Sequence, residues 1–84
     1  MTGIAEEFDA VKQHIKNGTK PDNYLERWKQ ILVECWELQD QINSEDNSLK
    51  FADLMILANE YSKLVPKETA LKLATGWRME YKKS

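Results

Sequence analysis

Three acidic side chains, Glu34, Glu37 and Asp53, border apolar helix faces, where carboxylates can bind a cation. Glu34 and Glu37 are three positions apart, so an α-helix places them on one side, one turn apart. Asp53 has a leucine four residues before it and another four residues after it, and an ionised carboxylate in such company needs a cation or several donors. An ion pair with Lys50, three residues earlier, is the simplest local explanation.

Four helical segments carry these residues. Apolar side chains recur at three- and four-residue steps, which predicts helices near residues 3–17, 22–43, 49–65 and 67–82. We expect Thr2, Asp22 and Ser48 to cap the first three, and Asn17-Gly18 to end the first. The connection over residues 44–48 is short and polar, so the second and third helices should be antiparallel neighbours.

The expected fold is therefore all-α: a small four-helix domain with a central antiparallel helix hairpin, in which residues 1–84 form one domain. The apolar stripe of the second helix consists of Tyr24, Trp28, Ile31, Cys35, Leu38 and Ile42. Glu34 lies just beside this stripe and Glu37 further round, as glutamates do on many solvated helices. Cys35 falls inside it, which predicts a buried side chain and not a reactive thiol.

Composition excludes several classes of function. With 12 basic and 14 acidic residues the formal charge is −2, and no basic patch marks a nucleic-acid surface. Arg78, Lys82 and Lys83 are interpreted as cations near a helix C-terminus. A single cysteine, Cys35, and a single histidine, His14, argue against an internal disulfide and against zinc. No apolar run has the length of a membrane span and no signal-peptide pattern opens the chain, so we expect a cytoplasmic protein without membrane partners.

The segment LVECWELQDQI, followed by KFADLMILA, resembles the core of the MazG-like all-α nucleoside triphosphate pyrophosphohydrolases. That family carries E-x-x-E on one helix and E-x-x-D on the next, in antiparallel contact. Glu34 and Glu37 match the first pair, and Asp53 matches the last acid. The resemblance covers roughly residues 27–64. It departs from the family at Lys50, which stands where the family has its third acid.

The resemblance implies a magnesium site. Mg²⁺ prefers hard oxygen ligands and keeps several waters, so carboxylates from two facing helices and substrate phosphates can hold it. In the family this arrangement activates a water that cleaves between the α and β phosphates. Two arrangements stay open here. Either Glu34, Glu37 and Asp53 bind one Mg²⁺ weakly, or the Lys50 ammonium takes the metal's place and compensates their charge. No catalytic base is assigned.

Two classes of function follow. The first is a MazG-like nucleotide pyrophosphohydrolase, or a catalytically impaired relative that still binds nucleotides. The alternative is a small helical protein–protein interaction module, a regulator or inhibitor of a larger enzyme, with no catalysis. A domain of this size buries only about 60% of its unfolded surface, so we also expect a homodimer or larger assembly. The third helix, apolar over most of its circumference, is the expected interface.

Overall fold

The computed structural model describes residues 3–41 and 45–83, except for the side chains of residues 45 and 46. The helices of this part of the chain are α1 (Ile4–Asn17), α2 (Tyr24–Asp40), α3 (Glu45–Ser62) and α4 (Lys67–Lys83). The all-α fold predicted from the sequence is confirmed. None of the described helices is both long enough and apolar enough to cross a membrane.

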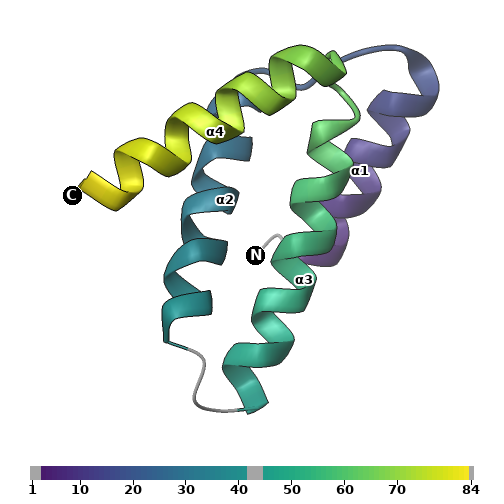
Figure 1. The fold of residues 1–84 in the computed structure, drawn as a ribbon. Coiled ribbons are helices and arrows are strands. Elements are labelled where there is room, and N and C mark those ends of the chain that lie inside the picture. Colours follow the sequence, from purple (N-terminus) through teal and green to yellow (C-terminus); the bar gives the residue numbers. More distant parts are fainter. Residues whose placement is uncertain (1–2, 42–44, 84) are drawn as a thin grey trace.

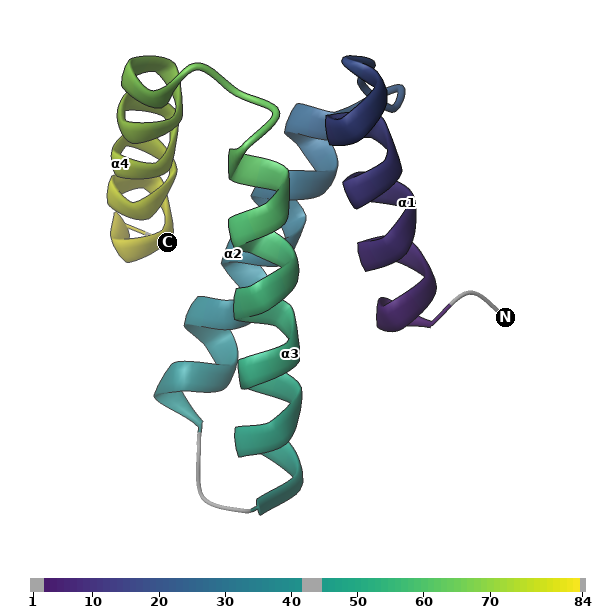
Figure 2. The same ribbon diagram turned by 90° about the vertical axis from the view of Figure 1, so that its right-hand side faces the viewer.

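The centre of the fold is the antiparallel hairpin of α2 and α3, which make the most extensive contact between any two elements (Figure 1). This is the predicted hairpin. The N-terminal helix α1 runs beside α3, and the C-terminal helix α4 packs against α2. The turned view shows α1 and α4 on opposite sides of the hairpin (Figure 2). Neither outer helix covers the hairpin as far as its tip.

The hydrophobic core lies mainly between α2 and α3, and it also includes Val11 of α1 and two residues of the connection from α3 to α4, Leu64 and Val65. Its buried members are Val11, Trp28, Ile31, Cys35, Leu54, Leu57, Ala58, Tyr61, Leu64 and Val65. Ile31 and Leu57 are both 0% exposed, and burying such a side chain contributes roughly 1.5–3 kcal/mol. On the α4 side, Trp77 packs edge-on against Trp28 with ring centroids 5.2 Å apart. The predicted stripe of α2 is therefore the core face from Tyr24 to Leu38, whereas Ile42 lies outside the described residues.

The helix ends agree with the sequence in part. Gly18 ends α1 in the left-handed region at φ 72°, and its N–H donates to the carbonyls of His14 and Ile15, as the Asn17-Gly18 signal predicts. The cap predicted at Asp22 is wrong. Asn23 occupies the N-cap of α2 at φ 57° and makes no side-chain cap bond. Asparagine tolerates this conformation better than most residues. The other predicted cap, Thr2, lies outside the described residues.

The start of α3 also corrects the prediction. The helix begins at Glu45, so Ser48 lies within it and does not cap it. The sequence Glu45-Asp46 places acidic residues in the first turn, where the helix dipole favours them. Asn47 Nδ2 donates to the Gln41 carbonyl at 3.3 Å and so connects α3 to the end of α2. The second helix ends at Asp40, before the predicted 43; residues 42–44 lie outside the described part of the chain.

Candidate functional site

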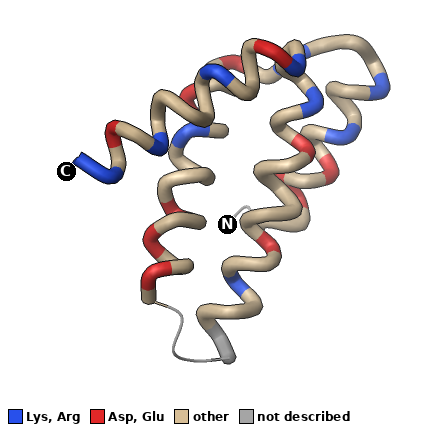
Figure 3. Tube along the Cα trace, viewed as in Figure 1, with Lys and Arg blue, Asp and Glu red and all other residues tan. Residues whose placement is uncertain are grey.

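Glu34, Glu37 and Lys50 line one hollow, together with Leu38 and Gln41. The hollow has a volume of about 260 Å³ and lies between the C-terminal half of α2 and the start of α3. Figure 3 shows acidic residues along this half of α2 and a basic residue near the start of α3. All three charged side chains are exposed. The antiparallel hairpin thus brings the E-x-x-E acids of α2 and the lysine of α3 to one place, as their register in the two helices requires.

Asp53 lines a different hollow. It lies between α1 and α3, has a volume of about 250 Å³, and is also lined by Ile4, Phe8, Asp9 and Ile56 among others. The carboxylate is exposed and not embedded in the core as the neighbouring leucines suggested. Asp53 lies on the outer side of α3, which is open to solvent although it carries apolar side chains such as Ile56, 54% exposed.

Leu49 illustrates this, because it is 61% exposed although it stands one turn before Asp53. Its side chain therefore forms no apolar wall around the carboxylate. The local Lys50–Asp53 ion pair expected from the sequence is likewise not formed, although both residues are described. The sequence suggested that the Asp53 carboxylate would need a partner among apolar residues. Because the carboxylate is exposed to solvent, it needs none.

The residues as placed do not fit a magnesium centre. Within residues 3–41 and 45–83, no group of three or more His, Cys, Asp or Glu side chains is close enough to hold a metal ion. The predicted ligands are divided: Glu34 and Glu37 share a hollow with a cation, and Asp53 lies in another. Mg²⁺ needs near-octahedral oxygen coordination, and two carboxylates do not provide it. Lys50 shares their hollow without forming an ion pair to either glutamate.

A polar network that the sequence analysis missed joins α1, α2 and α3. Arg27 donates to both carboxylate oxygens of Glu7, from Nε at 2.7 Å and from Nη2 at 2.8 Å. The buried Tyr61 hydroxyl donates to the same carboxylate at 2.6 Å. The bonds from Arg27 lower the pKa of Glu7 against the opposing effect of burial, and the bond from Tyr61 lowers it further. Burial, then the bond to Glu7, raise the pKa of Tyr61.

A signal for this network was present in the sequence. Glu7 stands four residues before Val11, and Arg27 four residues before Ile31, so each charge falls inside an apolar helix face. Both following residues are almost completely buried. A pair of opposite charges on the core faces of two helices predicts a buried or half-buried ion pair between them.

Cys35 and His14, the single cysteine and the single histidine of the sequence, are the side chains whose types could serve as a nucleophile and as a base. Cys35 is 1% exposed, as predicted, and burial raises the pKa of its thiol to about 11. A thiol of this kind is almost entirely protonated at neutral pH and unreactive. His14 is half-buried, and its Nδ1 lies 2.8 Å from Thr19 Oγ1 beyond the end of α1. Cys35 is therefore a residue of the core, and His14 contacts the segment that follows α1.

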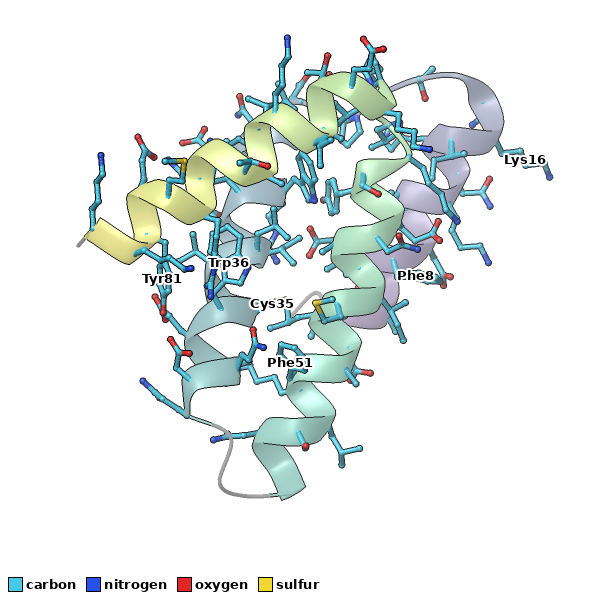
Figure 4. The ribbon with its side chains drawn as sticks, viewed as in Figure 1. Phe8, Lys16, Cys35, Trp36, Phe51 and Tyr81 are labelled. Carbon is cyan, nitrogen blue, oxygen red and sulfur yellow. The ribbon has the colours of Figure 1, made fainter. Side chains whose placement is uncertain are left out.

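A second cluster lies between α2 and α4, where Arg78 contacts two aromatic rings. The guanidinium carbon is 5.2 Å from the centroid of Trp36 and 5.5 Å from that of Tyr81, and the two rings are 5.5 Å apart. The Tyr81 hydroxyl donates to Asp40 Oδ2 at 3.3 Å. Figure 4 shows Trp36 and Tyr81 extending from neighbouring parts of the two helices. The sequence indicated only a cation near a helix end; the contact between helices is new.

No protein-family model, no curated protein and no solved structure matches this chain. The resemblance to the MazG-like enzymes therefore rests only on Glu34 and Glu37 of α2, on Asp53 and on the helical hairpin. What the structure establishes is a small all-α four-helix protein with an acidic α2 whose hollow contains Lys50.

Proposed function

We propose that this chain is a catalytically impaired relative of the MazG-like pyrophosphohydrolases, which binds a nucleotide without hydrolysing it efficiently. The observation that carries the proposal is the position of Lys50 in the hollow lined by Glu34 and Glu37. In the family's pattern this position belongs to an acid. A cation in that place provides positive charge that a metal would otherwise supply.

The electrostatic reason is direct. Two carboxylates close together raise the free energy of each other's ionised form, and a nearby cation lowers it. The Lys50 ammonium can do this without a metal, since it shares the hollow with both glutamates. A divalent ion entering the hollow would then meet Lys50 as a like charge. We therefore expect weak Mg²⁺ binding and slow or absent cleavage of nucleoside triphosphates.

Two measurements test this proposal. Isothermal titration with nucleoside mono-, di- and triphosphates should show saturable binding that Mg²⁺ changes little. Release of pyrophosphate from the triphosphates should stay at the level of a blank. Fast, Mg²⁺-dependent release that Asp53→Asn abolishes would contradict the proposed impairment. The absence of binding to all of the nucleotides would contradict the proposed ligand.

The second candidate is the helical interaction module, and exposed apolar side chains on α3 favour it. Leu49 is 61%, Met55 46% and Ile56 54% exposed. Together they make an apolar outer side on the helix expected to form an interface. In this second proposal the chain is a homodimer, or the partner of a larger protein, that uses α3.

Light scattering tests the homodimer. A particle of twice 9.8 kDa at micromolar concentration is expected. Ile56→Glu should reduce it to the mass of one chain, because the new charge would be desolvated in the interface. Met79→Glu on α4, where the wild-type side chain is 58% exposed, is the matched control and should leave the mass unchanged. A monomeric wild-type protein would contradict self-association through α3.

A further inference from the structure

The two arginines of this chain have opposite surroundings. Arg27 forms an ion pair with Glu7, which accepts from two of its nitrogens. Arg78 has no carboxylate within ion-pair distance among the described residues. Its Nη1 is buried and has no hydrogen-bond acceptor in the same part of the chain. A buried donor on a charged group without an acceptor is rare in folded proteins and calls for an explanation.

Two acids close to this cluster have other partners, and a third, Glu37, acts on Tyr81 and forms no ion pair with Arg78. Asp40 accepts a hydrogen bond from Tyr81, and Glu80 is paired with Lys29 at 3.7 Å. Within residues 3–41 and 47–83, no carboxylate therefore forms an ion pair with Arg78. The chain as a whole is acidic, with a formal charge of −2. An arginine without an ion-pair partner among the described residues is therefore unexpected in a contact between two of its helices.

The two rings hold the guanidinium in a defined place. Trp36 extends from α2 and Tyr81 from α4, and both lie within 5.5 Å of the Arg78 guanidinium carbon. Stacking on aromatic rings is a common way to orient an arginine, and its planar set of N–H donors matches the oxygens of a phosphate. A ring beside a phosphate-binding cation also offers a flat surface on which a base can stack.

We propose that Arg78, held against Trp36 and Tyr81, binds the phosphate group of a nucleotide. This inference rests on the proposed nucleotide binding and assigns its phosphate to the contact between α2 and α4. The hollow lined by Glu34 and Glu37 is the less favourable place for a metal-free phosphate, because its two carboxylates outweigh the single positive charge of Lys50 and repel the anion. Arg78 as a whole is half-buried, so phosphate oxygens can approach its side chain from solvent, whereas the buried Nη1 would reach them only after the guanidinium turns.

Nuclear magnetic resonance titration tests the site with four probes: inorganic phosphate, pyrophosphate, AMP and adenosine. The signals to follow are the Arg78 Nε–H and the Trp36 indole N–H. Phosphate-bearing probes should shift the Arg78 signal in a saturable way, AMP should also shift that of Trp36, and adenosine should leave Arg78 unchanged. Arg78→Gln should weaken AMP binding by about tenfold or more, the scale of a lost charge-assisted contact.

Two further variants sharpen the test. Lys72→Gln removes the same charge from an exposed position of α4 and should change AMP affinity by less than about twofold, the scale of a screened surface charge. Asp40→Asn removes the acid beside Tyr81 and should tighten binding, because it removes a repulsion.

The outcomes separate this site from the proposed function. If wild-type protein binds AMP and Arg78→Gln binds it equally well, the Arg78 site is overturned while nucleotide binding stands. If inorganic phosphate binds through Arg78 but AMP binds no more tightly, the phosphate site stands and the nucleotide proposal fails. If no probe produces a shift that depends on Arg78, the guanidinium only packs against the rings and the inference is overturned.

Discussion

Replacing Glu7 should loosen the attachment of α1 to the hairpin, because this one carboxylate accepts hydrogen bonds from two other helices. Arg27 on α2 donates twice and Tyr61 on α3 donates once. The Arg27 and Glu7 side chains are 36% and 22% exposed, so solvent screens the ion pair in part. The geometry is nevertheless a two-bond fork, which is stronger than an ordinary surface pair.

The magnitude follows from these contacts. Hydrogen bonds to charged groups contribute roughly 1.5–3 kcal/mol, and exposed ion pairs only about 0.2–1 kcal/mol. We place Glu7→Gln between them, at about 1–2 kcal/mol, because glutamine retains an acceptor for one donor. Glu7→Ala should cost about 2–3 kcal/mol, since it also leaves the Tyr61 hydroxyl, in a residue 4% exposed, without an acceptor. Urea denaturation followed by circular dichroism measures both.

The pH dependence gives an independent check. The folded-state pKa of Glu7 lies below its ordinary value of 4.5. Its stabilisation is therefore complete above the unfolded-state pKa and is lost as the pH falls through the lower folded-state value. The difference in unfolding free energy between wild type and Glu7→Gln should be constant above about pH 5 and shrink below about pH 4.5. Taking this difference removes the contribution of the other acids.

A double-mutant cycle decides whether the network acts as a unit. Tyr61→Phe keeps the buried ring and removes only the donor, and alone it should cost about 1 kcal/mol. Its effect should be much smaller when Glu7 is already glutamine. A pH-independent difference between wild type and Glu7→Gln, together with additive effects in the cycle, would refute the reasoning.

Two further predictions concern the core. Native Cys35 should react with a thiol reagent at pH 8 at least about a hundredfold more slowly than in denaturant, because its pKa is raised to about 11 and its side chain is buried; equal rates would contradict this burial. Ile31→Ala should cost about 2–5 kcal/mol in urea denaturation, because Ile31 is 0% exposed. Leu71→Ala, at a position of α4 that is 71% exposed, is the control and should stay within about 0.5 kcal/mol; comparable losses would contradict the assigned core face.

The helices and the core of α2 could be predicted because their signals are local. The spacing of Trp28, Ile31 and Cys35 fixes one helix face, and all three are buried. The left-handed Gly18 follows from a residue type that tolerates positive φ. The same local reasoning misjudged Ser48, because a serine near a helix start can cap it or lie within its first turns, and only the position of the connection decides.

The side-chain contacts between helices could not be predicted in this way. The outer side of α3 is apolar as well as its core side, so the sequence did not show which side Asp53 would take. The contact of Arg78 with Trp36 depends on how α4 crosses α2, which no local pattern specifies. Gly76 is a smaller example. A glycine inside a helix can mark a close approach of another element, but a Cβ at this position of α4 would meet nothing within 4 Å among the described residues.

The measurement that most directly tests the role of Lys50 is the effect of Mg²⁺ on the melting temperature of wild type and Lys50→Glu. An ion at ten times its dissociation constant stabilises the native state by roughly 1.4 kcal/mol, or about 5–10 °C for a domain of this size. Lys50→Glu should melt below wild type without metal and regain stability with Mg²⁺, whereas wild type and the charge-matched control Lys72→Glu should respond by less than about 1 °C. A wild-type protein that Mg²⁺ already stabilises as strongly as the variant would contradict the account, because Lys50 would then not be taking the place of a metal.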